Sequence, residues 1–129
     1  MNIKPTESEL QILNILWKQG PSSVREVHEA LTQKEAGYTT TLKLMQIMHE
    51  KKMLRRNTDA KTHIYEAAVN KEQTQGQLVR RVIDNVFNGS AMQLVMQALG
   101  QHKATASELE EIRTYLRKME EEQDKKKPQ

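Results

Sequence analysis

The sequence predicts a mainly α fold in which three helices and a β-hairpin are followed by an arm of three further helices. Three observations lead to this prediction. Helix-capping residues stand directly before segments with apolar residues at helical spacing. Two short runs of alternating character, separated by turn residues, follow the third helical segment. From residue 70 onwards the helical pattern returns three times.

The first predicted helix starts at a capping box, Thr6-Glu7-Ser8-Glu9, in which the first side chain accepts from a backbone N–H and the last reaches back. Gly20-Pro21 ends this helix. Trp17 is expected to anchor the core, because it lies on the apolar face of the helix. That face comprises Leu10, Ile12, Leu13, Ile15, Leu16 and Trp17.

The second predicted helix starts at Ser23, which forms another capping box with Glu26. Its buried side carries Val24, Val27 and Leu31. A linker over residues 32–37 then leads to the third helix. Three consecutive helices with short connections are typical of the helix-turn-helix arrangement.

The third predicted helix covers residues 38–54 and has two different faces. Thr41, Met45 and Met48 recur at helical spacing and form a buried stripe. The opposite face carries Thr39, Thr40, Lys43 and Gln46. Short polar, cationic and amide side chains are the types that reach phosphates and base edges in the major groove of DNA. The sequence therefore predicts a helix that packs on one side and reads double-stranded DNA on the other.

Each residue of this outer face has an expected role. Thr39 and Thr40 contact a phosphate or a thymine methyl group. Lys43 and Gln46 reach base edges, where Lys favours guanine and Gln favours adenine. The hydroxyl of Tyr38 is within the same segment and is a candidate for a phosphate contact. The alternative for the two threonines is that they serve only as helix caps.

A β-hairpin is predicted directly after the third helix. Residues 54–57 and 61–66 have strand character, and Thr58-Asp59-Ala60 separates them as a turn. A hairpin in this place is a wing, and three helices with a wing make a winged helix-turn-helix domain. The wing residues expected near the sugar-phosphate backbone are Arg55, Arg56, Lys61 and His63.

Positive charge is concentrated in the third helix and the wing. Residues 38–63 hold six Lys or Arg against two Asp or Glu, although the net charge of the 129-residue chain is only +3. Cations placed in this way neutralise DNA phosphates and raise affinity without reading sequence. The alternative is that Lys51, Lys52, Arg55 and Arg56 merely solvate the end of a helix and favour its dipole.

The C-terminal arm is predicted to contain helices over residues 70–88, over 90–99 and from Ser107, where Glu110 completes a capping box. Gly100 is expected to close the second of them. Their apolar stripes exceed what a short arm can hide alone, so we expect two chains to pair as a homodimer. The alternative is a monomeric cap folded onto the first domain. The expected dimerisation residues are Leu78, Val82, Ile83, Val86, Leu94, Val95, Leu99, Leu109, Ile112 and Leu116.

The predicted organisation is a winged-helix DNA-binding domain over residues 1–70 and a dimerisation domain over 71–122. A tail over 123–129, which is rich in charge, is expected to be disordered. In a dimer, two recognition helices related by a two-fold axis would read an inverted repeat.

Composition and motifs argue against several other classes. The chain has no cysteine, its four histidines lack paired ligand spacing, and its seven methionines fit packing stripes better than a copper site. We therefore expect no metal and no cofactor. Neither a glycine-rich phosphate loop nor a nucleophile constellation indicates an enzyme. No apolar run is long enough to enter a membrane, so we expect a cytoplasmic protein without membrane insertion.

Three groups of residues together resemble the penicillinase repressor (BlaI/MecI/CopY) family of bacterial winged-helix transcriptional repressors. They are Thr6-x-x-Glu9-Leu10-x-Ile12-Leu13-x-x-Leu16-Trp17, Ser23-Val24-Arg25-Glu26-Val27, and Tyr38-Thr39-Thr40-Thr41 followed by Met45, Met48, Lys51 and Leu54. The resemblance implies a homodimer that binds palindromic operators with TACA and TGTA half-sites and blocks transcription. In the β-lactam branch of the family a membrane-bound sensor metalloprotease releases the repressor by cutting the dimerisation arm, so the resemblance makes such a protease a candidate partner.

The chain departs from the family pattern at three points. It lacks the C-terminal cysteines of the copper-responsive branch, and it lacks the Asn-Phe bond that is cut in the β-lactam branch, having Phe87-Asn88 in the reverse order. Lys52 stands where many members have Gly, so we expect it to alter the end of the third helix. The competing function is that of a protein-interaction adaptor that keeps the winged helix without specific DNA binding.

Overall fold

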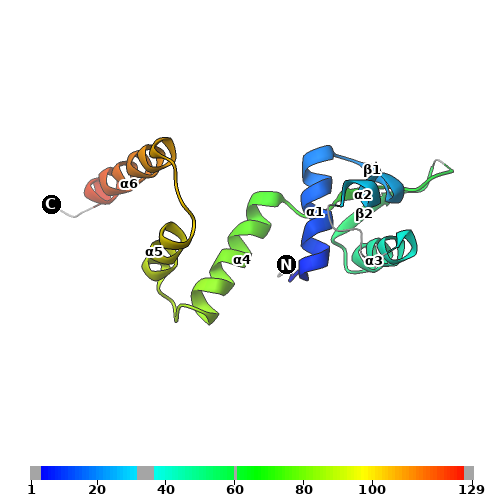
Figure 1. Cartoon of the computed structure of the whole chain (residues 1–129), viewed down its shortest axis with the longest axis horizontal. Helices are drawn as coiled ribbons and strands as arrows, with labels where there is room; N and C mark the ends of the chain where they lie inside the picture. The colour runs from blue at the N-terminus through cyan, green and yellow to red at the C-terminus, as the bar shows by residue number, and fades with distance from the viewer. Residues whose placement is uncertain (1–3, 32–36, 60, 127–129) are drawn as a thin grey trace. The chain divides into compact units, whose positions relative to one another are not determined.

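The computed structural model of the chain describes residues 4–31, 37–59 and 61–126, and it is mainly helical with one small antiparallel sheet (Figure 1). This confirms the predicted fold class of a winged helix followed by a helical arm. The elements in chain order are α1 (Glu7–Gln19), β1 (Ser22–Ser23), α2 (Val24–Ala30), α3 (Tyr38–Glu50), β2 (Leu54–Asn57), β3 (Ile64–Ala67), α4 (Lys71–Asn85), α5 (Ala91–Gln101) and α6 (Ala106–Lys126).

The chain divides into two compact units, Met1–Val82 and Ile83–Gln129. The division falls within α4, whereas the sequence suggested a boundary at residues 70 and 71. The first part of α4 therefore belongs to the N-terminal unit, and its Thr74 side chain is buried there. The linker over residues 32–36 lies outside the described residues.

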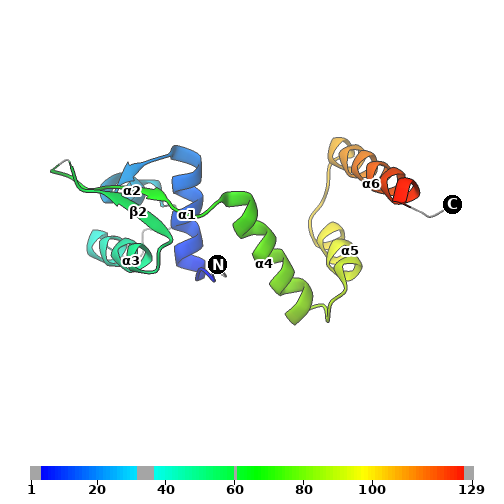
Figure 2. The same ribbon diagram turned by 180° about the vertical axis from the view of Figure 1, so that it is seen from behind.

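The N-terminal unit contains the predicted wing. β2 and β3 pair in antiparallel fashion with Leu54 opposite Ala67 and Asn57 opposite Ile64, and the hairpin projects from the unit beside α3 (Figure 2). β1, which the sequence did not predict, pairs with the other edge of β3 and gives the order β1-β3-β2. Two residues are too few to show a period, so only the pairing with a distant strand identifies β1.

The core of the N-terminal unit lies between the three helices and the sheet, and it includes the predicted stripe of α3. Trp17 is half-buried, and its indole Nε1 donates to the carbonyl oxygen of Val69 at 3.0 Å. This bond ties α1 to the residues just before α4. The buried apolar residues are Ile12, Leu13, Leu16, Val24, Val27, Met45, Met48, Met53, Leu54 and Tyr65.

Both predicted capping boxes at the start of the chain are confirmed. At α1, the Thr6 N–H donates to Glu9 Oε1 at 2.9 Å while the Glu9 N–H donates to Thr6 Oγ1 at 3.2 Å. At α2, Ser23 and Glu26 exchange the same two bonds at 2.9 and 3.2 Å. Each box satisfies backbone donors that the first turn of a helix leaves without a partner.

The end of α3 differs from the prediction. The helix stops at Glu50, and Leu54 already belongs to β2. Lys52 has a φ of 68°, its N–H donates to the His49 carbonyl at 3.1 Å, and the Met53 N–H donates to the Met48 carbonyl at 2.9 Å. This pair of bonds around a left-handed residue is a Schellman motif, which reverses the chain into the wing.

The arm differs from the prediction in three details. Gly100 does not close α5, because the helix continues to Gln101. The capping box of α6 is formed by Thr105 and Glu108, which exchange bonds of 3.0 and 3.1 Å, and not by Ser107 and Glu110. Both pairs match the same pattern, and the earlier one gives the longer helix. α6 also runs to Lys126, so residues 123–126 are helical, while 127–129 lie outside the described residues.

Candidate nucleic-acid interface

The exposed face of α3 begins without a side-chain cap. Gly37 is the N-cap residue, and within the described part of the chain no side chain caps this helix, so the interpretation that Thr39 and Thr40 serve only as caps is wrong. Both threonines are exposed, as are Lys43 and Gln46 further along the helix. The α3 surface that was predicted to read DNA is therefore open to solvent.

A shallow groove lies between α3 and the wing, and it brings residues of both elements together. Tyr38 and Gln46 come from the helix, whereas Lys61 and His63 come from the segment that leads into β3. The groove therefore combines a cation, an amide and a phenol from segments far apart in sequence. Its complete lining is Val24, Tyr38, Leu42, Gln46, Lys61, Thr62, His63 and Tyr65.

The two wing arginines are placed differently from Lys61 and His63. Arg55 is the register partner of Glu66, and its Nε donates to Glu66 Oε1 at 2.8 Å in an exposed ion pair. Arg56, the next residue of β2, is the register partner of Tyr65. Both arginines line a second concave surface of the hairpin and not the groove beside α3. The structure thus separates Arg55 and Arg56 from the other predicted contacts.

Lys51 has a structural partner. Its Nζ lies 2.9 Å from Glu9 Oε2, and the Glu9 side chain is only 1% exposed. The bond joins the first turn of α1 to the residue that ends α3. This geometry favours a structural role for Lys51 over a contact with DNA. Among the described residues, Lys43, Arg56 and Lys61 make no ion pair.

The ionisation of Glu9 reflects these contacts. Burial raises the pKa of its carboxyl group, but the hydrogen bonds from Thr6 and Lys51, together with the charge of Lys51, outweigh burial. The pKa of Glu9 consequently lies below its ordinary value. The carboxylate is thus kept charged while it holds two helices together.

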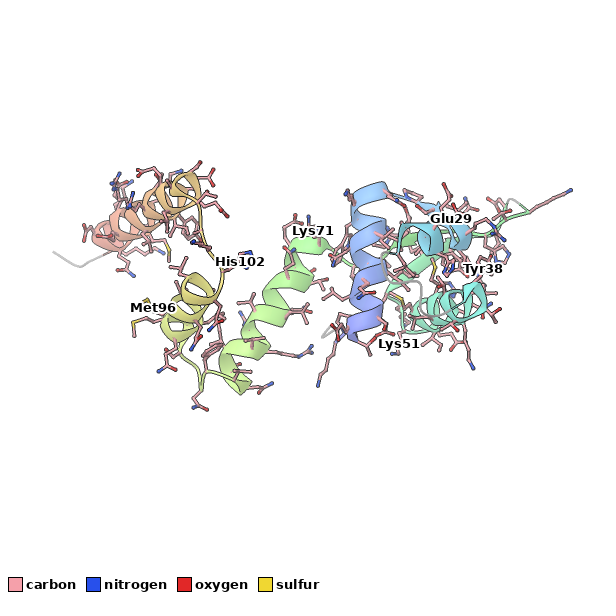
Figure 3. The ribbon with its side chains drawn as sticks, viewed as in Figure 1. Glu29, Tyr38, Lys51, Lys71, Met96 and His102 are labelled. Atoms are coloured by element: carbon pink, nitrogen blue, oxygen red, sulfur yellow. The ribbon has the colours of Figure 1, made fainter. Side chains whose placement is uncertain are left out.

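A cluster between α2 and α3 was not predicted. His28 Nδ1 lies 2.8 Å from the hydroxyl of the buried Thr41, and the His28 ring meets the Tyr38 ring edge-on at 6.0 Å. The guanidinium of Arg25 lies over the Tyr38 ring, 4.9 Å from the ring centroid. Figure 3 labels Tyr38 on α3 and Glu29 on the neighbouring α2. Local sequence patterns gave no signal for these contacts, because the contacts join residues of different helices.

The arm helices leave their apolar stripes uncovered in the single chain. Neither α5 nor α6 has a buried residue among those described. Val86 is 65% exposed, Val95 50% and Leu116 51%. Leu78, Ile83, Leu94 and Ile112, which were also predicted to pair between chains, are half-buried, while Val82, Leu99 and Leu109 are exposed.

The described residues hold no group of three or more His, Asp or Glu side chains arranged to bind a metal ion. No helix within the described ranges combines the length and the apolar character that crossing a membrane requires.

Comparison with known proteins gives one family. A family model described as penicillinase repressor matches residues 5–118 of the 129-residue chain. No match was found among curated proteins. The matched range spans the N-terminal unit and most of the arm.

Proposed function

The chain belongs to the penicillinase repressor family, and from that premise we propose that it is a transcriptional repressor that binds an inverted-repeat operator as a homodimer. The observation that carries the proposal is the exposed polar face of α3 beside the groove that it shares with the wing. A helix of this kind in the major groove and a hairpin on the adjacent backbone are the DNA-binding parts of winged-helix proteins. Such a protein would act in the cytoplasm, where its DNA is.

Base reading is assigned to the middle of α3. Lys43 would donate to guanine and Gln46 would pair with adenine, because these side chains match the donors and acceptors of those base edges. Thr39 and Thr40, one turn earlier, would contact a phosphate or a thymine methyl group. All four side chains are exposed, and none of them belongs to the buried core.

Phosphate contacts are assigned to the groove and the wing. Lys61 and His63, which lie beside α3 in the groove, take the phosphate contacts there. Arg56 has no ion pair among the described residues, so its full charge is available. Arg55 must exchange Glu66 for a phosphate, so its contribution should be the smallest of the set.

The arm is assigned to pairing between two chains. Its apolar residues are uncovered in the single chain, and covering them by a second copy would remove this surface from water. Two linked DNA-binding units would then bind two half-sites together, which multiplies affinity.

Release by a membrane-bound sensor protease is proposed from the family resemblance alone. The chain has no Asn-Phe bond, so a cut in the arm would use another bond. Incubation of the dimer with a protease of this class, followed by mass determination of the fragments, would identify the bond that is cut.

Selection of bound fragments from genomic DNA by the purified full-length protein tests the central proposal. The expected result is enrichment of an inverted repeat. Binding to the enriched duplex should weaken steeply as salt rises, because phosphate contacts release counterions. A scrambled duplex of the same composition is the control and should bind much more weakly. If no inverted repeat is recovered, and the protein binds both duplexes equally or binds neither, the repressor proposal fails. The protein-interaction adaptor would then be the better account of its function.

A further inference from the structure

A cation at the start of α3 has no part in the roles assigned above. Arg25 is the second residue of α2 and is exposed, and its guanidinium lies over the ring of Tyr38, the first residue of α3. Two segments separated by the 32–37 linker thus place a fixed positive charge beside the helix that is proposed to enter the major groove.

The guanidinium of Arg25 keeps its hydrogen-bond donors. The contact places the central carbon of the guanidinium over the Tyr38 ring, and among the described residues no hydrogen bond or ion pair uses its five N–H groups. The carboxylate of the neighbouring Glu26 accepts from the Ser23 N–H at 2.9 Å and forms no ion pair with Arg25. Among the described residues no carboxylate forms an ion pair with Arg25.

Tyr38 is itself held in place from the core. The His28 ring meets it edge-on, with an angle of 86° between the ring planes, and His28 Nδ1 lies 2.8 Å from Thr41 Oγ1. Thr41 is 4% exposed, so this chain of contacts begins in the packed interior and ends at the guanidinium of Arg25. A cation that is fixed before binding loses less conformational freedom when it meets an anion.

We infer that Arg25 is a further DNA contact of this chain, which donates to a backbone phosphate beside the start of α3, and that Tyr38 is the positioning residue that holds it there. The inference rests on the proposed DNA-binding function. The ligand is a phosphate because the first helix of a helix-turn-helix crosses the DNA backbone, while the second enters the groove. A guanidinium matches phosphate oxygens with two parallel donors. In this arrangement the ring of Tyr38 matters and its hydroxyl does not.

The experiment uses the full-length protein and two labelled duplexes, one enriched by the wild type from a random-sequence pool and one scrambled. Arg25→Ala should weaken binding roughly ten-fold or more on both duplexes, because a charge-assisted bond to each half-site is lost. The slope of affinity against salt should fall by about one phosphate contact for each protomer. Arg25→Lys should keep the salt slope and recover part of the affinity.

Variants of Tyr38 separate positioning from direct contact. Tyr38→Phe should bind within about two-fold of the wild type, because the ring remains under the guanidinium. Tyr38→Ala should lose several-fold in affinity, and the double variant Arg25→Ala/Tyr38→Ala should bind no more weakly than Arg25→Ala alone. Lys18→Ala, which removes an exposed cation from the last turn of α1, is the matched control and should change neither affinity nor salt slope.

Each other outcome would overturn the inference. If Arg25→Ala leaves both affinity and salt slope unchanged, Arg25 does not contact DNA. If affinity falls only for the enriched duplex, Arg25 contacts a base and not a phosphate. A loss in Tyr38→Phe as large as in Tyr38→Ala would make the hydroxyl the ligand. Thermal unfolding of every variant identifies any loss that comes from misfolding, and Arg25→Lys then decides whether charge is required. If the wild type enriches no sequence and binds neither duplex, the proposed function itself fails, which is a different result from all of these.

Discussion

Lys52 has the least favourable backbone conformation for its residue type at the end of α3. Its φ of 68° lies in the left-handed region, where a side chain costs roughly 1–2 kcal/mol and glycine costs little. The family resemblance had marked this position as one where glycine is usual, and the structure gives the physical reason. At this position, where the chain turns into the wing, lysine is therefore less favourable than glycine.

Replacement of Lys52 by glycine should therefore stabilise the protein. We expect Lys52→Gly to raise the free energy of unfolding by about 1 kcal/mol in urea denaturation, since relief of the left-handed strain exceeds the added freedom of the unfolded chain. Lys52→Ala, which removes the charge but keeps a Cβ, is the control and should leave stability nearly unchanged. A gain in Lys52→Ala equal to that in Lys52→Gly would assign the effect to charge.

Glu9 gives the protein a dependence on acidity. Because its pKa is lower in the folded than in the unfolded chain, its contribution is complete above the unfolded pKa and disappears as the pH falls through the folded pKa. Glu9→Gln should lower the free energy of unfolding by roughly 1–2 kcal/mol at pH 7, because the charge-assisted bond to Lys51 is lost. Urea denaturation at several pH values should show the difference between the two proteins shrinking as the pH falls below the ordinary pKa of Glu, about 4.3. A constant difference across that range would contradict this account.

At the level of elements, α3 and the wing are expected to contribute differently to DNA recognition. Gln46→Ala should cost roughly 1–3 kcal/mol at particular bases of the operator, whereas Lys61→Ala should weaken all sequences alike and reduce the salt dependence. Binding measured on the operator and on a scrambled duplex distinguishes the two. Equal losses of Gln46→Ala on both duplexes would rule out base reading by this residue.

Local signals explain which elements the sequence predicted correctly. The boxes at Thr6 and Ser23 were recognisable because each joins residues only three apart. The start of α6 was misplaced because Thr105-x-x-Glu108 and Ser107-x-x-Glu110 fit the capping-box pattern equally well. The pattern alone does not decide between them. β1 was missed because its only evidence is a pairing with Ile64 and Tyr65, far along the chain.

The candidate site follows the same division. The outer face of α3 could be read from helical spacing, and Thr39, Thr40, Lys43 and Gln46 are all exposed there. The partners of the charged residues could not, because Lys51 and Glu9 are 42 positions apart, and Arg25 meets Tyr38 across the 32–37 linker. A periodic pattern places a side chain on a face but does not name what lies opposite.

For the whole molecule, the exposed stripes of the arm predict that pairing and operator binding are linked. Val86→Asp places a charge where 65% of an apolar side chain is exposed in the single chain, so each chain should still fold. In a dimer the same charge would be buried without a partner, and the dissociation constant should rise at least roughly 100-fold. Sedimentation analysis would measure this change, and operator affinity should fall with it.

The adjacent Asn85→Asp is the matched control for that variant. It adds the same charge one position earlier, on an exposed polar residue, and should leave both the dimer and its operator affinity unchanged. A dimer that survives Val86→Asp would move the pairing surface away from the end of α4. Equal disruption by the two variants would indicate a general effect of negative charge in this part of the arm.

The bond from Trp17 to the carbonyl of Val69 makes the chain its own spectroscopic probe. Trp17 is the chain's one tryptophan, and its indole N–H is engaged two residues before α4 begins. Emission from the indole reports the polarity and hydrogen bonding around it. Any event that pulls α4 away from α1, whether a cut in the arm or a change of partner, would therefore shift the fluorescence without an added label. The fluorescence of Trp17 would therefore follow the connection between β3 and α4 in real time.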